Sequence, residues 1–318
     1  MSSVTALARY ALGEAWSHRT DQGWWLRRAR EWKNTPFYAG SSTRRESLSV
    51  MDADWDTLVV LDACRVNLFE AVVGTDRFDA YRRVQSPASA TSEWMRYSFP
   101  DEYGDTVYVA GSPMLARHAA GSFHRVEEVW RDGFDPEVGT VPAGHVTDAA
   151  LAARSAHPNK RQIVHYIQPH YPFVHDPDLQ FWSWSGTPEL DSDHADDRAR
   201  HVWEALEKGL VDRATVWAAY RRNLEYVMEH VTEFLDGIDG RTVITADHGN
   251  LVGERLTPVV GQRGYGHPPC RRHPALTTVP WATVDSAPRR EIVEGAVKSH
   301  SAASESEVDE RLRALGYV

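Results

Sequence analysis

Two short apolar segments of the chain each end in an aspartate. Residues 57–61 read Thr-Leu-Val-Val-Leu and lead into Asp62, and residues 242–246 read Thr-Val-Ile-Thr-Ala and lead into Asp247 and His248. Continuous apolar runs of this length are typical of buried parallel strands, and open α/β sheets bind ligands at the carboxyl ends of such strands. Carboxylate oxygens and imidazole nitrogens suit zinc and similar divalent cations. We therefore expect Asp62, Asp247 and His248 to be metal ligands.

Further histidines lie in loops that could approach the same site. His170 and His175 lie in a proline-rich loop that follows an apolar run at 162–167, and His267 lies beside two glycines in Gly-Tyr-Gly-His-Pro-Pro. The motif Asp-His-Gly alone is weak, because Asp247 could simply cap a helix or a turn. The combination of motifs is stronger than any one of them. Other histidines are interpreted as ordinary surface or core residues: His157, His194, His201 and His230.

Strands and helices are predicted to alternate along the chain. Apart from the two apolar runs, strands are expected at 81–84, 106–110 and 162–167, and helices at 92–97, 143–154 and 214–235. The last helix is the clearest, because its apolar residues recur at three- and four-residue steps. This alternation predicts an α/β fold with a mostly parallel central sheet and helices on both faces. The irregular segment at 169–197 is long enough to be a lid or a ligand-binding loop.

The first 50 residues are predicted to form a helical segment rich in tryptophan and arginine, ahead of a larger domain at 51–318. Such a helix can lie on a membrane surface, although packing against its own domain or a partner subunit is the more common outcome. No membrane span and no secretory signal is evident. With only Cys64 and Cys270, the cytoplasm is the default compartment, and membrane association through the N-terminal helix is the alternative. The net charge of −10 argues against a nucleic-acid partner.

The order of these motifs resembles that of a known enzyme family. Asp62 follows an apolar strand, a Ser/Thr loop comes next, and Pro-His-Tyr-Pro, Thr-Ala-Asp-His-Gly, Gly-His-Pro and Val-Pro-Trp then follow between 169 and 281. This order is similar to that of the alkaline phosphatase superfamily, and most similar to its sulfatase-like branch. The resemblance covers roughly residues 55–281, and the closing segment 311–317 is also similar to the end of many sulfatase-like chains.

The resemblance implies a nucleophile on a loop at the start of a helix, bound directly to the metal. Sulfatases carry a Cys/Ser-x-Pro-x-Arg motif for formylglycine at that place, and this motif is absent here. The loop reads Ser-Pro-Ala-Ser-Ala-Thr at 86–91 and is similar to the threonine loops of phosphoryl-transferring members. Thr91 is therefore the expected nucleophile and Ser89 the second candidate. The alternative is that Thr91 only caps the following helix.

The remaining roles are also implied by the resemblance. Thr91 would join the three metal ligands around one or two divalent ions, which could be Zn, Mn, Mg or Ca. His170 and His267 would either hold a second ion or protonate the leaving group and bind its oxygens. Arg65 could pair with substrate oxygens, although a surface salt bridge is at least as common, and His175 is a further substrate-binding candidate.

Three functions remain open at this point. The first is a metal-dependent hydrolase of phosphate or phosphonate esters, acting on a small anionic ester through Thr91. The second is a transferase that moves a phospho- or sulfo-group onto a lipid or glycan. The third is a non-catalytic member of the superfamily that acts as a binding or accessory protein.

Overall fold

The computed structural model describes residues 47–181, 199, 201–256, 263–298, 303–315 and 317. Its strands are β1 (Thr57–Leu61), β2 (Ala80–Gln85), β3 (Tyr103–Ala110), β4 (Phe123–Glu127), β5 (Arg161–Tyr166), β6 (Gly240–Thr245), β7 (Leu251–Arg255), β8 (Arg263–Gly266) and β9 (Thr278–Ser286). Seven of these strands form one sheet in the order β2-β9-β6-β1-β5-β3-β4, and β7 and β8 form a separate hairpin-like pair.

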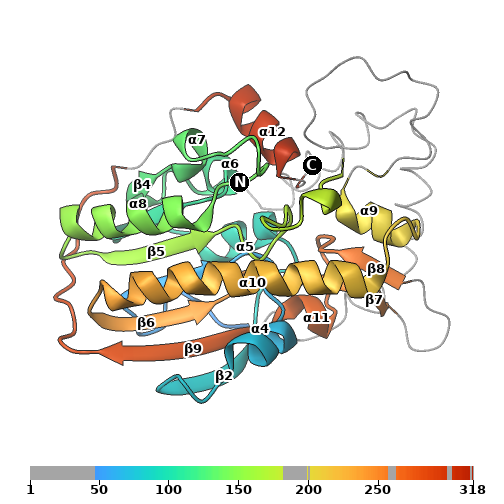
Figure 1. The fold of residues 1–318 in the computed structure, drawn as a ribbon. Coiled ribbons are helices and arrows are strands. Elements are labelled where there is room, and N and C mark those ends of the chain that lie inside the picture. The colour runs from blue at the N-terminus through green and yellow to red at the C-terminus, as the bar shows by residue number, and fades with distance from the viewer. Residues whose placement is uncertain are drawn as a thin grey trace.

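The central sheet is mostly parallel, as the sequence predicted. β1 pairs in parallel with β5 and β6, and β3 pairs in parallel with β4 and β5. Only β9 runs against its neighbours, because it is antiparallel to both β6 and β2. In Figure 1 the arrowheads of β5 and β6 point to one end of the molecule, and that of β9 points to the other. The parallel strands therefore deliver their following residues to a single edge.

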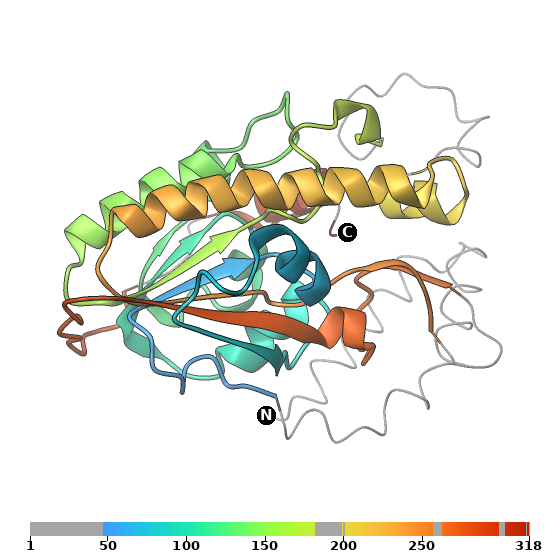
Figure 2. The ribbon, with the colours of Figure 1, turned by 60° about the horizontal axis from the view of Figure 1, so that its bottom comes forward.

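Helices cover both faces of this sheet. They are α4 (Val66–Val73), α5 (Thr91–Ser98), α6 (Met114–His118), α7 (Val129–Asp132), α8 (Ala143–Ala156), α9 (Val202–Glu207), α10 (Arg213–Asp236), α11 (Pro274–Thr277) and α12 (Glu305–Ala314), with a short 3-10 turn, η1 (Pro177–Leu179). Helices α8 and α10 pack side by side on one face, and α5 lies on the opposite face (Figure 2). The predicted arrangement of helices on both faces is confirmed.

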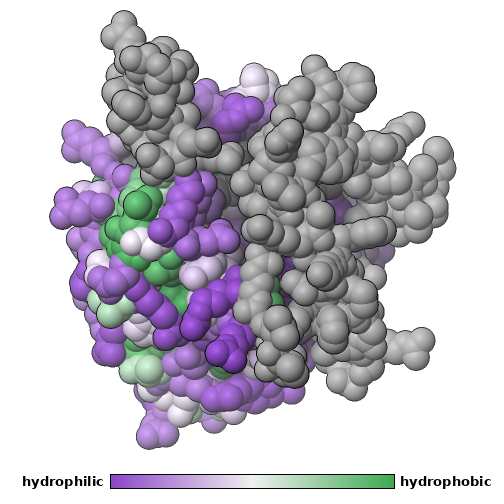
Figure 3. Space-filling view, turned by 90° about the vertical axis from the view of Figure 1, so that its right-hand side faces the viewer, coloured by the Kyte–Doolittle hydropathy of each residue, from purple (hydrophilic) through white to green (hydrophobic). Residues whose placement is uncertain are grey.

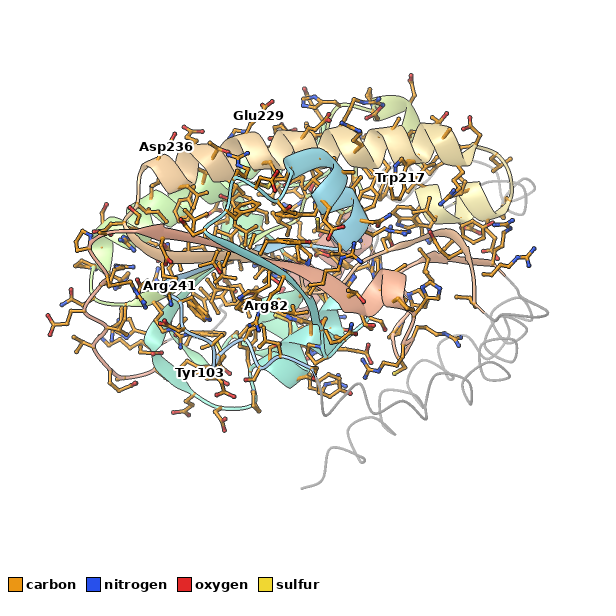
Figure 4. The ribbon with its side chains drawn as sticks, turned by 90° about the horizontal axis from the view of Figure 1, so that it is seen from below. Arg82, Tyr103, Trp217, Glu229, Asp236 and Arg241 are labelled. Atoms are coloured by element: carbon orange, nitrogen blue, oxygen red, sulfur yellow. The ribbon has the colours of Figure 1, made fainter. Side chains whose placement is uncertain are left out.

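The register of the central strands decides where the two aspartates lie. Every residue of β1 is buried, as expected for an apolar strand with neighbours on both sides and helices on both faces. Val60 pairs with Thr245 of β6, so Asp62 and Asp247 follow at the same level, two residues further along. Figure 4 shows Trp217 at one end of α10, and Asp236 and Arg241 near the other end, where β6 begins.

Several elements differ from the sequence-based expectation. The strand expected at 106–110 begins at Tyr103, and β4, β7, β8 and β9 were not expected as strands. The predicted N-terminal helical segment at 1–50 lies outside the described residues except for 47–50. The predicted long loop at 169–197 is described only for 169–181. Among the described residues, no helix is long and apolar enough to cross a membrane.

After β9 the chain returns across the sheet to reach α12. The backbone N–H of Val293 donates to Asn159 O, and that of Lys298 donates to the carbonyl of Phe123 in β4. The carbonyl of Ala296 accepts a hydrogen bond from the His124 ring at 2.8 Å. The segment 293–298 therefore runs from the loop before β5 to the start of β4, which is the last strand of the sheet.

Helix α10 holds the loop after β5 through one buried amide. The side chain of Asn223 is 1% exposed. Its Nδ2 donates to the carbonyls of Pro169 (3.2 Å) and His170 (3.0 Å), and its Oδ1 accepts from the backbone N–H of Val174 at 3.1 Å. One side chain thus satisfies three buried backbone groups and fixes the position of the histidine loop on the helix.

We predict that Asn223→Ala lowers the free energy of unfolding by about 2 kcal/mol, because it leaves buried backbone groups without partners. Urea unfolding followed by circular dichroism would measure the change. The control is Arg221→Ala on the exposed side of the same helix, which removes only an exposed ion pair with Glu225 and should cost no more than about 0.5 kcal/mol. Equal losses in the two variants would contradict the role given to Asn223.

Candidate metal centre

The ends of β1 and β6 bring three potential ligands together. One ligand atom from each of Asp62, Asp247 and His248 lies within 4.8 Å of the others, and all three side chains are buried. His248 Nε2 lies 3.3 Å from Asp247 Oδ2 and 3.8 Å from Asp62 Oδ1. The hydroxyl of Thr91 lies 3.1 Å from His248 Nε2 and 3.4 Å from Asp62 Oδ1. The structure therefore brings together the four residues that the sequence analysis grouped around a metal.

The two oxygens of Asp247 have different surroundings. Oδ1 accepts the backbone N–H groups of Ala63 (3.0 Å) and His248 (2.8 Å). Ala63 has a positive φ of 55°, an uncommon conformation for a residue with a Cβ. It is held there in part by the Tyr220 hydroxyl, which donates to the Ala63 carbonyl. Oδ2 is buried and has no hydrogen-bond partner among the described residues.

An unpaired buried carboxylate oxygen is costly. Asp247 Oδ2 faces His248 Nε2, and both atoms belong to the cluster of possible ligand atoms. A cation bound within the cluster would give this oxygen its missing partner. The arrangement of Asp247 therefore fits a metal site and does not fit a simple helix or turn cap.

The tautomer of His248 follows from its backbone contact. Nδ1 lies 2.7 Å from the carbonyl oxygen of Gly249. A carbonyl can only accept, so Nδ1 carries the proton, and a neutral ring then presents a lone pair on Nε2. A carbonyl that fixes the tautomer in this way is common behind metal-binding histidines. His248 is thus oriented to offer Nε2 to a cation.

The charges of the cluster also fit a divalent cation. Burial, followed by the charge of Asp247, raises the pKa of Asp62 well above its ordinary value. Two buried carboxylates this close resist being ionised together. A divalent cation would compensate both charges and let both carboxylates act as ligands. The donor set of two carboxylates and one imidazole suits zinc and related metals.

Thr91 and Ser89 have different roles in the loop before α5. Ala90 occupies the capping position of α5, and no side chain caps that end, so Thr91 is the first residue of the helix and not its cap. Its hydroxyl faces the ligand cluster. Ser89 Oγ instead lies 3.0 Å from Pro268 O and from Glu93 Oε2 and accepts the Arg271 N–H. Ser89 therefore ties its loop to the segment at 268–271.

Two histidines form a second group beside the cluster. His170 Nδ1 donates to the carbonyl of Tyr171, so its Nε2 is unprotonated in the neutral ring. That Nε2 lies 2.8 Å from His267 Nε2, which must then be the donor of the pair. The ring of His267 lies 4.7 Å from that of His248. The structure thus places both predicted histidines next to the ligand cluster.

Burial keeps this histidine pair neutral. It lowers the pKa of His170 to about 4, and it lowers the pKa of His267 well below its usual value. Neutral imidazoles can bind a cation or exchange a single proton with a substrate.

One residue at the cluster, Tyr317, was missed by the sequence analysis. His201 was interpreted as an ordinary residue, and its role is structural, because its Nδ1 caps α9 by accepting from Glu204 N. Tyr317 donates a hydrogen bond to Asp62 Oδ2 and stacks on His170 at 4.7 Å. Its only signal was the closing segment 311–317.

Arg65 and His175 lie in other surroundings. Arg65 Nη1 donates to Glu254 Oε1 at 2.6 Å and to the carbonyl of Asn250 at 3.1 Å, and the guanidinium lies over the Trp217 ring. These contacts are the salt-bridge alternative of the sequence analysis. His175 is exposed and packs edge-on against Tyr226 of α10. The contacts of these two residues are with scaffold residues and not with the ligand cluster.

We predict that the purified protein binds a divalent cation and that Asp247→Asn loses most of this binding. The substitution removes one of two carboxylates and leaves a poorly filled coordination sphere. Metal content after dialysis, measured by elemental analysis, and the thermal shift on adding Zn²⁺ or Mn²⁺ would both report it. His145→Ala serves as control, because this exposed histidine contacts Gly133 O and no cluster residue. Unchanged metal content in Asp247→Asn would rule out the assignment.

Comparison with known proteins identifies similar solved structures. The chain is similar to the soluble domain of lipooligosaccharide phosphoethanolamine transferase A from Neisseria meningitidis, with 14% identity, a TM-score of 0.47, and coverage of 72% of this chain and 75% of that one. It is similar to the periplasmic domain of EptC from Escherichia coli in complex with zinc, at 13% identity, TM-score 0.41, and 71% and 72% coverage. It is also similar to a putative sulfatase from Bacteroides thetaiotaomicron, at 12% identity, TM-score 0.45, and 82% and 70% coverage.

These similarities are distant. No family model and no curated protein sequence matches the chain. The similar structures are phosphoethanolamine transferases and a putative sulfatase. With TM-scores of 0.47 and below, they assign no activity to this chain. Its function has to be argued from the geometry of the site.

Proposed function

We propose that the protein is a metal-dependent hydrolase of phosphate or phosphonate esters that uses Thr91 as its nucleophile. The observation that carries this proposal is the position of the Thr91 hydroxyl. It lies 3.1 Å from His248 Nε2 and within 3.5 Å of both oxygens of Asp62, inside a buried cluster with an unpaired carboxylate oxygen. A divalent cation held by Asp62, Asp247 and His248 would lower the pKa of the hydroxyl and stabilise the charge of the phosphoryl oxygens.

The reaction would proceed in two substitutions at phosphorus. In the first, Thr91 Oγ1 loses its proton and forms a bond to phosphorus, while the bond from phosphorus to the leaving oxygen breaks and that oxygen takes up a proton. In the second, water attacks the phosphorylated threonine, and Thr91 regains its hydroxyl as phosphate or phosphonate leaves. The position of Thr91 at the first residue of α5 supports this course, because the N-terminus of a helix favours an anionic group.

The histidine pair is placed to serve the leaving oxygen. The His267 Nε2–H is a donor and the unprotonated His170 Nε2 an acceptor, so the pair can hold one substrate oxygen and exchange one proton with it. A bound phosphoryl group would raise the pKa of both rings through its negative charge, which reverses part of the effect of burial. The alternative for this pair is a second cation, for which two neutral imidazoles are suitable ligands.

Seen from the side to which the parallel strands point, the described part of the surface is mostly hydrophilic, with a smaller group of hydrophobic residues (Figure 3).

The alternative function is a transferase, in which an alcohol on a lipid or glycan replaces water in the second substitution. The first substitution on Thr91 is the same in both cases, so the two functions differ only in the acceptor.

We predict that Thr91→Ala lowers kcat for any ester substrate by at least about a thousandfold, because the nucleophile is lost, while the fold is kept. A matched control is Thr232→Ala, which removes a threonine hydroxyl that donates to Met228 O within α10. Ser89→Ala should lose stability more than kcat, since Ser89 Oγ holds the loop to the segment at 268–271. Wild-type kcat in Thr91→Ala together with a dead Ser89→Ala would transfer the role to Ser89.

We further predict that phosphate diesters or phosphonate monoesters are turned over with a higher kcat/KM than sulfate monoesters. The chain lacks the motif that forms formylglycine, and a threonine alkoxide activated by metal is suited to phosphoryl transfer. Matched nitrophenyl esters, assayed with the same metal and salt, would give the comparison, and added alcohols would reveal transfer products. A preference for the sulfate would contradict the proposal, and no turnover by a metal-loaded protein would favour the binding-protein alternative.

A further inference from the structure

We propose that Tyr317 is a positioning residue of the metal centre, which orients the ligand Asp62 and the histidine His170 at the same time. This inference rests on the proposed function, because it assigns a partner to the metal ligands of that site. The phenol group of Tyr317 donates to Asp62 Oδ2, and its ring stacks on His170 with 4.7 Å between the centroids and 13° between the planes. Both contacts come from one side chain that belongs to neither of the strands that supply the ligands.

Tyr317 reaches the site because α12 is anchored to the body of the protein. Val308, Leu312 and Leu315 are buried in the main core. Arg131 binds Glu307 at 3.1 Å, and Arg117 pairs with Asp309. The backbone N–H of Tyr317 then donates to Leu312 O at 3.0 Å, which turns the chain back toward the end of the helix. Figure 1 shows α12 at the end to which β5 points, close to the C-terminus.

The Tyr317 phenol is the donor in its hydrogen bond to Asp62 Oδ2, because an ionised carboxylate oxygen can only accept. Because Asp62 is fully buried, a donor to its second oxygen satisfies a group that would otherwise be costly to desolvate.

This donor decides which oxygen of Asp62 faces a cation. With Oδ2 bound to the phenol, Oδ1 is the oxygen that lies 3.8 Å from His248 Nε2, while the Thr91 hydroxyl lies within 3.5 Å of both oxygens. Hydrogen bonds to the outer oxygen of a metal-binding carboxylate hold its orientation, and losing such a bond typically weakens metal affinity about 10- to 100-fold. Tyr317 should therefore contribute to metal affinity without being a ligand.

The stacked ring has a separate effect on His170. The imidazole is held by its Nδ1–H bond to Tyr171 O and by the face of Tyr317, and this leaves Nε2 directed at His267. Tyr317→Phe would keep the stacking on His170 and lose the hydrogen bond to Asp62. Tyr317→Leu would lose the stacking and the hydrogen bond. The two substitutions therefore separate the effect on the metal ligand from the effect on the histidine pair.

The test compares Tyr317→Phe and Tyr317→Leu with the wild-type chain. The control is Tyr81→Phe, which removes a hydroxyl on the edge strand β2 that donates to Glu70 of α4. Zn²⁺ and Mn²⁺ dissociation constants, measured by competition with a chelator, give a readout that does not depend on activity. We expect Tyr317→Phe to weaken metal binding about 10- to 100-fold, with kcat largely recovered at saturating metal. Tyr317→Leu should show the same loss of affinity and a lower kcat at saturating metal, while Tyr81→Phe should match the wild type.

The outcomes separate the two proposals. If wild-type protein binds no divalent cation, the metal-dependent function fails, and this inference fails with it. If the wild type binds metal and Tyr317→Phe binds it equally well, only the role of Tyr317 is overturned. If both Tyr317 variants are more active than the wild type at every metal concentration, the tyrosine obstructs the site and the positioning role is also overturned.

Discussion

The parallel pairing of β1 with β6 is the constraint on which the site depends. It places Asp62 and Asp247 at the same level of the sheet edge, where helices on both faces exclude water. Two carboxylates in such a position repel each other and are poorly solvated. Hydrogen bonds from neighbouring groups compensate part of this cost. Asp247 Oδ1 accepts two backbone N–H groups, and Asp62 Oδ2 accepts the hydroxyl of Tyr317. What remains is one inward-facing oxygen from each carboxylate, which is the arrangement a cation requires.

Helix α10 supports this edge from one side. Tyr220 donates to the carbonyl of Ala63, the residue whose N–H orients Asp247, and Asn223 fixes the loop that carries His170. A single long helix thus positions both the turn after β1 and the loop after β5. Its buried polar groups are not interchangeable with apolar ones, because each satisfies backbone atoms next to the ligands.

The sequence predicted the central part of the fold and much of the cluster. Thr57–Leu61 was expected as a strand with the same bounds, because a short, mostly apolar run that ends at a charged residue is typical of a buried parallel strand. The four grouped ligand candidates meet in space for the same reason, since each follows a strand or begins a helix at one sheet edge. Strand β9 was not expected, because Pro280 interrupts its pattern. Pro280 is tolerated because it lies beyond the last β6–β9 pair, Thr245–Trp281, where β9 has only β2 as a neighbour.

The parts that were missed depend on contacts distant in sequence. Tyr317 meets Asp62 only because α12 docks against α6 and α7. No local pattern encodes such packing. Arg65 was given two alternatives from its position after Asp62, a substrate contact and a salt bridge, and its guanidinium pairs with Glu254.

The path of the chain between β9 and α12 also affects how the protein behaves in solution. Because β9 runs antiparallel to β6, the chain leaves β9 at the opposite end of the sheet from the site, and the return segment 293–298 reaches the start of β4. β4 is an edge strand, and an open edge can pair with an edge of another molecule. The Lys298 N–H donates to the carbonyl of Phe123, the first residue of β4, and the charged pair Arg125–Glu127 lies further along the same strand. The antiparallel direction of β9 therefore has a second consequence, which is that the return segment covers the first residues of an edge that could pair with another molecule.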